Sequence, residues 1–577
     1  MGCAGLAALL LAGVAQAPLA RADDDGFRPG NLLVSRAVYG ANPNNITPGV
    51  TQLPPNCVAP NCVTAVASGL YPLVFNNDTV DASFGITSKI VLDQMTRWGE
   101  LVSSLEVPNS SQRHIAANSD QMVTSFSSKS EIALNLSTDK RVVTFMGYLA
   151  PVDAIDVSNS NTPFVIDPTN PVPGTDYRVV AAVDEHGHFQ FTKTNAYSGN
   201  NGRAVVLNNT NGASLLYTTG NAGNGGNPQP NGIIVGAGAQ IMTAAKVPLA
   251  AQPDPSLPTP VGSFSITQLG LKADKVGKDT NFRGLTQFNN VVYSTKGSGS
   301  NGVNTVYFID TSGFDSQSRP LACPNGTGVP NPSATLPTSP IIYTASLLQT
   351  KGVFPYNMCI LNGFPTTLAK AATATFPFGV WFANATTLYV TDEGNGTTTF
   401  DPSTGTYTAA AAQTTAGLQK WVFDATSGAW KQAYVLTAGL GLGVPYTVQN
   451  YPTGNNPVTG LPWAPATDGL RNLTGHVNRD GTVTIWAITS TVSGNGDQGA
   501  DPNRLVKITD HLAATTVPAD AQFRTIRTAR SGEVLRGVSF TPGTGAPPHD
   551  HDDFDDHDHD DHDHDGDRDH DGDRDNR

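Results

Sequence analysis

The chain repeats a short pattern in which apolar and polar positions alternate over two strands joined by a tight turn. The clearest copies run from Phe282 to Thr295 and from Leu470 to Trp486, and residues 535–542 repeat only the first strand. The turns consist of Asn, Asp and Gly, which tolerate the backbone conformations that hairpins need. A hairpin that recurs along a chain is typical of a β-propeller, whose blades are small antiparallel sheets.

The other apolar segments fall into groups of four strands. Five groups follow one another at 131–192, 202–267, 282–344, 379–436 and 470–526. The group at 202–267 includes predicted strands at 233–235 and 263–267, and the group at 282–344 ends with a predicted strand near 341–344. A strand at 534–540 completes a further blade with 31–36, 89–93 and 100–105, so that no sheet edge stays free. We therefore predict an all-β protein, a single β-propeller of six four-stranded blades, or of seven if residues 313–377 contain another.

The two faces of such a propeller differ in loop length. Turns between first and second strands, and between third and fourth strands, are short and define the short-turn face. The opposite long-loop face carries the segments 39–87, 151–176, 218–231, 394–417, 440–469 and 489–503. Because binding sites are commonly built from loops on a rigid scaffold, we expect a small-molecule, glycan or protein ligand on the long-loop face. The alternative is that these loops are solvated insertions.

Composition narrows the functional classes. Only 14% of the residues are charged, and the net charge of −14 is concentrated in residues 549–577, where fifteen Asp and three Arg sum to −12 and leave −2 for the rest. No basic stripe is present, so we predict no nucleic-acid partner. No segment after residue 22 is long and apolar enough to cross a membrane. We expect a monomer without a transmembrane segment.

The N-terminal segment has the features of a secretory signal. A short apolar run from Leu6 to Val14 is followed by small residues at Ala20 and Ala22, directly before Asp23. We expect residues 1–22 to be removed and the protein to be exported, to the outside, the periplasm or the cell surface. The mature chain then consists of a propeller at 23–543 and a disordered Asp/His-rich tail at 544–577.

Four cysteines remain after removal of the signal segment. In an exported protein an even number of cysteines indicates disulfides. We pair Cys57 with Cys62 and Cys323 with Cys359, because each pair then stays within one insertion.

The chain resembles a group of exported microbial β-propeller proteins from Asn31-Leu-Leu-Val-Ser-Arg36 to Phe540. Similar hairpin blocks include Asn195-Ala-Tyr-Ser-Gly-Asn-Asn-Gly-Arg203 and Gly417-Leu-Gln-Lys-Trp421. The resemblance covers most of the mature chain and implies the fold and export. It implies no defined activity, because that group is largely uncharacterised.

Four of the six inner strands begin with an arginine: Arg203, Arg283, Arg471 and Arg536. The topology places them around the mouth of the channel on the long-loop face, where guanidinium groups suit carboxylate, phosphate or sulfate. The alternative is that each arginine pairs with an acid or a carbonyl of the adjacent blade. The fifth blade has Phe378 instead, and its next strand ends in Asp392 and Glu393, our candidates for acid/base chemistry.

Histidines at two other places in the chain give less specific signals of a functional site. The segment from Asp184 to His188 resembles a metal cluster but falls at a predicted hairpin turn, for which a solvated turn is the better interpretation. His476 lies in an inner strand, and we interpret it as a core histidine rather than one facing the channel.

The tail carries the strongest chemical signal. Residues 561–567 and 567–573 both match the Asp-x-Asp-x-Asp-Gly opening of a calcium loop, without its closing Glu. Interspersed histidines are ligands for zinc or nickel. The alternative is a solubilising polyanion. The predicted metal ligands are Asp561, Asp563, Asp565, Asp567, Asp569, Asp571 and Asp573, with His557, His559, His562 and His564.

These features favour an exported β-propeller binding or scaffold protein with a metal-binding tail. The alternatives are a propeller hydrolase or lactonase acting at the channel mouth with a bound calcium, for which the fold alone is the argument, and a surface adhesin. A buried acidic cluster or a metal in the channel is what an enzyme requires and a scaffold does not.

Overall fold

The computed structural model describes most of the chain between residues 26 and 546. The described residues are 26–40, 46–47, 49–53, 57–60, 62–65, 86–115, 120–126, 130–166, 170, 172–221, 238–244, 250–251, 281–297, 302–309, 327–336, 338, 358–369, 375–457, 459–495 and 498–546. The predicted signal segment and the metal-ligand residues of the tail lie outside them. Thr544 accepts a hydrogen bond from the amide of Gly30 at 2.7 Å, so the folded body continues past the predicted boundary at residue 543.

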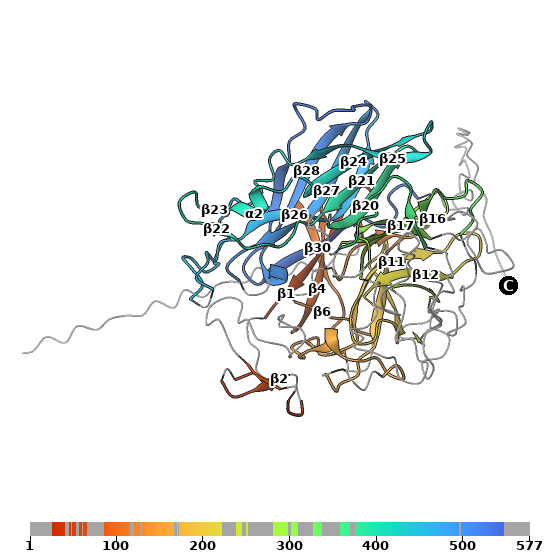
Figure 1. Ribbon diagram of the computed structural model, residues 1–577. Helices are drawn as coiled ribbons and strands as arrows, with labels where there is room; N and C mark the ends of the chain where they lie inside the picture. Colours follow the sequence, from red (N-terminus) through yellow and green to blue (C-terminus); the bar gives the residue numbers. More distant parts are fainter. Residues whose placement is uncertain are drawn as a thin grey trace, which may run out of the picture.

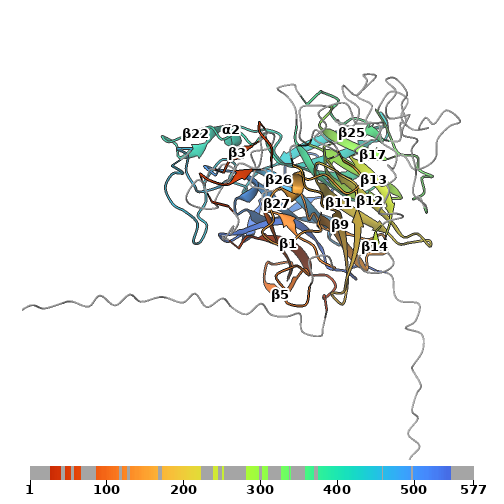
Figure 2. The ribbon, with the colours of Figure 1, turned by 90° about the horizontal axis from the view of Figure 1, so that it is seen from below.

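Six sheets form a ring, which confirms the six-bladed β-propeller (Figures 1 and 2). The first strand of each sheet packs against the first strands of the two neighbouring sheets, so six inner strands surround the axis. We number the blades one to six by these strands, which are β30 (Glu533–Phe540), β7 (Asn135–Leu136), β11 (Gly202–Asn208), β15 (Phe282–Phe288), β20 (Pro377–Asn384) and β26 (Ala466–Val477).

The outer strands of each blade follow its inner strand in antiparallel order. Blade one continues with β1 (Leu32–Val38), β4 (Thr87–Met95) and β5 (Leu101–Glu106), and blade two with β8 (Val142–Tyr148), β9 (Arg178–Asp184) and β10 (Phe189–Thr194). Blade three adds β12 (Leu215–Gly220) and β13 (Ala239–Thr243). Blade four adds β16 (Val291–Lys296), β17 (Thr305–Ile309) and β19 (Met358–Leu361). Blade five adds β21 (Thr387–Asp392), β24 (Gly417–Asp424) and β25 (Ala429–Leu436), and blade six adds β27 (Thr482–Val492), β28 (Arg504–His511) and β29 (Arg524–Thr528).

The ring closes by pairing the two ends of the folded chain, as predicted. Strand β1 runs antiparallel to β30 from the Leu32–Phe540 pair to the Val38–Glu533 pair. Arg36 Nη1 lies 2.6 Å from a Glu533 carboxylate oxygen, which adds an ion pair to the ladder. Strand β1 is therefore paired on both sides, with β30 and with β4.

Two predicted outer strands were placed wrongly. The third strand of blade three is β13, not residues 233–235, because Ala239–Thr243 supplies five consecutive partners for β12. The outer strand of blade four is β19, which pairs with β17, and not residues 341–344. Residues 233–235, 263–267 and 341–344 lie outside the described part of the chain.

The hydrophobic core lies between the blades. One cluster joins blades three, four and five, and others fill the contacts between blades one and two, two and three, five and six, and six and one. Since no blade buries both faces alone, the ring is the unit that supplies the core.

A buried hydroxyl in the second strand of four blades bonds to the backbone of the next blade, within its inner strand or, for Ser35, at Ile132 shortly before that strand. Its oxygen donates to a backbone carbonyl there, at 2.6 Å from Ser35 to Ile132 and 2.8 Å from Thr144 to Val205, with the same bonds from Thr295 to Phe378 and from Thr391 to Arg471. These bonds fix the spacing of the inner strands around the axis.

Short elements decorate the ring. They are β2 (Gln52–Leu53), β3 (Val63–Thr64), β6 (Thr124–Ser125), β14 (Ala250–Ala251), β18 (Thr327–Gly328), β22 (Phe400–Asp401) and β23 (Thr406–Tyr407), with helix α2 (Thr408–Ala411) and the 3-10 turns η1 (Val157–Asn159) and η3 (Gln498–Ala500). The predicted disulfide between Cys57 and Cys62 is confirmed. Cys323 lies outside the described residues, so its pairing with Cys359 stays a prediction. Within the described part of the chain, no helix is long and apolar enough to span a membrane.

Candidate functional site

A cavity of about 700 Å³ is enclosed by the inner strands of all six blades. Its lining includes Phe288, Phe382 and Val477, which stand at or near the strand ends that lead into the short hairpin turns. The cavity therefore lies at the short-turn end of the axis, and not at the long-loop end where we expected a ligand site.

The cavity lining follows a regular position in the inner strands. The third residue after each arginine position lines it: Val206, Thr286, Trp381, Thr474 and Ser539. In β15 and β26 a β-bulge lies at the arginine, and in β20 a β-bulge lies at the equivalent Phe378. These bulges determine which of the following residues face the cavity. This position recurs in the repeats as regularly as the arginines do, but its varied and mostly uncharged residues do not stand out in the sequence.

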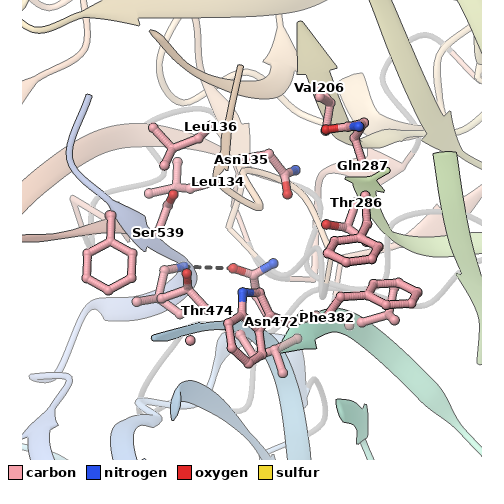
Figure 3. A pocket seen from close by; sticks show the side chains of 18 of the residues that line it. Leu134, Asn135, Leu136, Val206, Thr286, Gln287, Phe382, Asn472, Thr474 and Ser539 are labelled. Atoms are coloured by element: carbon pink, nitrogen blue, oxygen red, sulfur yellow. Dashed lines mark hydrogen bonds between the residues drawn. The ribbon is translucent and has the colours of Figure 1, made fainter. Parts of the chain in front are cut away.

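Two amides on different strands are oriented by neighbouring backbone. Asn135 Nδ2 donates to the Val205 carbonyl at 3.1 Å, and Asn472 Oδ1 accepts from the Val538 amide at 2.8 Å. These bonds assign the amide orientations, so an acceptor, Asn135 Oδ1, and a donor, Asn472 Nδ2, remain for a ligand. Figure 3 shows both side chains among those that line the cavity.

Aromatic rings form other parts of the wall. Phe288 and Phe382 stack with their ring centroids 4.6 Å apart and their planes inclined by 5°. Trp381 and Phe540 also line the cavity. The cavity thus combines apolar ring faces with uncharged hydroxyl and amide groups, including Gln287 (Figure 3).

Charged groups in the lining are Arg97, Lys140 and the titratable His476. Our interpretation of His476 as a core residue was wrong, because its half-buried ring lines the cavity. Burial and the charge of Arg97 lower the pKa of His476. The imidazole is therefore neutral at neutral pH and can accept or donate a hydrogen bond.

The four predicted arginines lie buried at the other end of the inner strands, and each contacts an adjacent blade or a long loop. Arg203 Nη1 donates to the Phe282 carbonyl at 2.8 Å, and Arg536 Nη2 donates to the Gly499 carbonyl at 3.0 Å. Arg283 Nη1 donates to Ser130 Oγ at 2.5 Å. These bonds are those expected if the arginines hold the blades together.

Glu393 joins two of these arginines. Its carboxylate oxygens lie 3.2 Å from Arg471 Nε and 3.7 Å from Arg283 Nη2. Phe378 stands where four of the other five blades have arginine, and the guanidinium groups of Arg283 and Arg471 face its ring at about 6 Å. Burial, first of all, lowers the pKa of Arg203 and Arg283, and the charge of Glu393 opposes this shift. Arg283, Arg471 and Glu393 thus form a buried ionic cluster at the long-loop end. A ligand-binding role of the predicted residues there stays a prediction.

Asp392 also lies in this region, together with a second aspartate that we had not identified. Asp392 accepts hydrogen bonds from the Phe376 and Gly394 amides at 2.8 and 2.9 Å. Burial raises its pKa to about 7, and burial raises the pKa of Asp468 to about 6. Neither carboxyl lines the axial cavity, so the predicted acid/base pair does not face this ligand space.

The described residues contain no group of three or more His, Cys, Asp or Glu arranged to hold a metal ion. The segment from Asp184 to His188 is a turn, in which Asp184 accepts bonds from the His186 and His188 amides, both at 2.9 Å. This agrees with the interpretation as a solvated turn.

Comparison with known proteins shows no family for this chain. Neither a family model nor a curated protein matches the chain. Among solved structures, it is similar to an ulvan lyase of polysaccharide lyase family PL25, with 10% identity over 89% of this chain and 96% of that chain and a TM-score of 0.28. It is also similar to the NanB sialidase of Streptococcus pneumoniae, with 10% identity over 80% of this chain and 48% of that chain and a TM-score of 0.14. Similarity at this level carries no inference about activity.

Proposed function

We propose that this propeller is an exported binding protein whose axial cavity receives a polyhydroxylated ligand, a saccharide unit of a glycan. The observation that carries the proposal is the pair of Asn135 and Asn472, each held by a neighbouring backbone group with its other amide atom left for a ligand. Such preorganised groups bind without a further cost in side-chain ordering.

The chemistry of the lining supports a saccharide over other small molecules. Sugar rings present both hydroxyl groups and apolar C–H faces, which match hydroxyl and amide groups beside aromatic rings. Thr286, Gln287, Thr474 and Ser539 supply the polar groups, and Phe288, Trp381, Phe382 and Phe540 supply the rings. The volume of about 700 Å³ lies within the range of small-molecule sites.

Catalysis at the channel mouth has weaker support. The raised pKa of Asp392 is a property of many general acids. However, Asp392 accepts backbone bonds, and Glu393 pairs with two arginines, so both carboxylates have structural partners. Binding remains the better-supported function, and the adhesin alternative is a variant of it in which the glycan belongs to another cell.

Export and metal binding by the tail are part of the proposal on sequence grounds. The signal-like segment at 1–22 and the disulfide between Cys57 and Cys62 support an exported protein. The repeated Asp-x-Asp-x-Asp-Gly pattern supports weak calcium binding, and the histidines between the aspartates support zinc or nickel.

Titration with a panel of oligosaccharides tests the cavity. Trp381 lies in the lining, so its fluorescence reports occupancy. The Gln287 side chain makes no hydrogen bond to the described part of the protein, so Gln287→Leu removes a ligand contact without breaking the fold, and we expect affinity to fall about tenfold. Gln432→Leu, on the exposed outer strand of blade five, is the matched control and should bind normally. Equal affinity of both variants and the parent protein for every sugar that binds contradicts the proposal.

A further inference from the structure

We propose that a second subsite beside the cavity binds an acidic sugar residue, so that the ligand is an anionic polysaccharide rather than a neutral glycan. The inference rests on the proposed cavity function and names the substrate class. The subsite consists of Trp98, Arg97, Lys507 and Arg524, where the β4–β5 turn of blade one meets strands β28 and β29 of blade six.

Three cations meet here without an acidic partner among the described residues. Lys507 and Arg524 are cross-strand partners in blade six. Arg97 Nε donates to the Gly30 carbonyl at 2.8 Å, which neutralises no charge. Burial lowers the pKa of Lys507 first, and the charges of Arg524 and Arg97 lower it further. The cations therefore repel one another, and a bound anion relieves that repulsion.

The exposed indole of Trp98 provides a stacking surface in the same place. Its side chain is 76% exposed although it is large and apolar. Lys507 Nζ lies 3.8 Å from the centroid of the Trp98 ring. The ammonium group therefore occupies one face of the indole and leaves the rest of it open. An exposed tryptophan next to unpaired cations matches a ring-shaped, negatively charged ligand.

A chain of contacts connects this surface to the cavity. Arg97 itself lines the cavity and lies over the ring of Phe540, with Cζ 5.1 Å from the centroid. Trp486 packs edge-to-face on Phe540 and donates from Nε1 to the Arg97 carbonyl at 3.2 Å. The subsite and the cavity thus share Arg97, an arrangement that suits successive sugars of one chain.

The observations favour a polysaccharide over other polyanions. The cavity presents uncharged hydroxyl and amide groups to the neighbouring unit, and the cationic group has only three members on a protein with a net charge of −14. A nucleic acid requires a longer basic surface. The acidic group is a carboxylate or a sulfate, which guanidinium and ammonium groups bind alike.

Matched pairs of oligosaccharides test the subsite on the full-length protein. Oligogalacturonates are compared with their carboxyl-reduced neutral forms, and sulfated dextran oligosaccharides with unsulfated dextran oligosaccharides of the same length, by calorimetry at low salt. We expect at least one acidic form to bind tenfold or more tightly than its neutral partner, with the difference shrinking as salt is added. The arm that shows the preference identifies carboxylate or sulfate.

Variants then assign the preference to these residues. Lys507→Gln with Arg524→Gln should abolish the preference while leaving the affinity for the neutral form unchanged, and Trp98→Ala should weaken both forms several-fold. Arg530→Gln, an exposed arginine between β29 and β30, is the matched control. An acidic preference that survives the double variant, or no preference at all, overturns the subsite while neutral binding in the cavity still stands. If Gln287→Leu leaves the binding of both forms intact, the cavity function fails instead.

Discussion

The ammonium group of Lys420 lies 3.3 Å from the carboxylate of Asp510, and both side chains are fully buried between blades five and six. Tyr389 and Tyr434 also donate to Asp510, at 2.6 and 2.8 Å. Lys420 further donates to the carbonyls of His511, Leu512 and Ala514. A buried charge pair with this many hydrogen bonds is costly to break, because either partner alone is left without compensation.

We predict that Lys420→Met lowers the free energy of unfolding by about 3–5 kcal/mol. The matched control is Lys431→Met, which removes a lysine paired with Asp424 on the exposed edge of the same blade. Exposed pairs contribute about 0–1 kcal/mol. Chemical denaturation of both variants measures the difference, and equal losses contradict a structural role for the buried pair.

The hydroxyls between blades give a second stability prediction. Thr295 Oγ1 accepts from the Gly284 amide at 2.8 Å and donates to the Phe378 carbonyl. Thr295→Val keeps the shape but leaves both backbone groups unpaired, which costs about 1–3 kcal/mol. Thr397→Val, at an exposed loop position of blade five, should cost almost nothing. The melting temperatures of the two variants test this prediction. Equal melting temperatures show that the Thr295 hydroxyl is dispensable.

Asp501 makes stability depend on pH. Burial raises its pKa to about 7, above the ordinary value of 3.8, and its Oδ2 has no hydrogen-bond partner among the described residues. Because the folded pKa is raised, its contribution to stability is complete below about pH 4 and is lost as the pH rises through 7. We predict that Asp501→Asn gains about 2–4 kcal/mol relative to the parent between pH 4 and pH 8. The free energy of unfolding of both proteins is measured across that range. A difference between variant and parent that stays constant from pH 4 to pH 8 contradicts the prediction.

Ring closure by β30 predicts different outcomes for two truncated chains. A chain ending at Arg530 loses β30 and with it the ladder to β1, so it should not fold. A chain ending at Ala546 keeps the bond between Gly30 and Thr544 and should melt at the temperature of the full chain. Circular dichroism and a thermal melt compare the three chains, and equal melting of all three rules out the closure.

The tail predicts two kinds of metal response. Calcium bound by the aspartates should be insensitive to pH near neutrality, whereas zinc or nickel bound by the histidines should be released as they protonate near about pH 6. Calorimetry on the full chain and on the chain ending at Ala546 separates the tail from the ring. If both chains bind these ions equally, the tail acts only as a polyanion.

Much of the fold was predictable because it depends on local pattern. Hairpin turns and alternating strands identify the blades, and the leftover strands at the two ends of the chain identify the closure. Strands β13 and β19 were misplaced because long insertions separate them from their partners, and the register of a strand is decided by pairing rather than by its own composition.

The site was less predictable for a related reason. The arginines are conspicuous in the repeats, yet their side chains bind groups of the neighbouring blades and loops, as Arg471 binds Glu393. The cavity is lined by less distinctive residues such as Thr286 and Ser539, whose role depends on a bulge that shifts the strand by one position. Trp98 and Lys507 meet only because the first and last blades close on each other.

We propose that the ligand binds in the axial cavity at the short-turn end. A crystal structure of the full chain with an oligosaccharide from the panel decides between this site and the long-loop face. We predict a sugar ring in contact with Asn135 Oδ1, Asn472 Nδ2 and Gln287, with its face on an aromatic ring of the wall. A ligand bound among the loops at 394–417 or 440–469, with the axial cavity empty, contradicts the account.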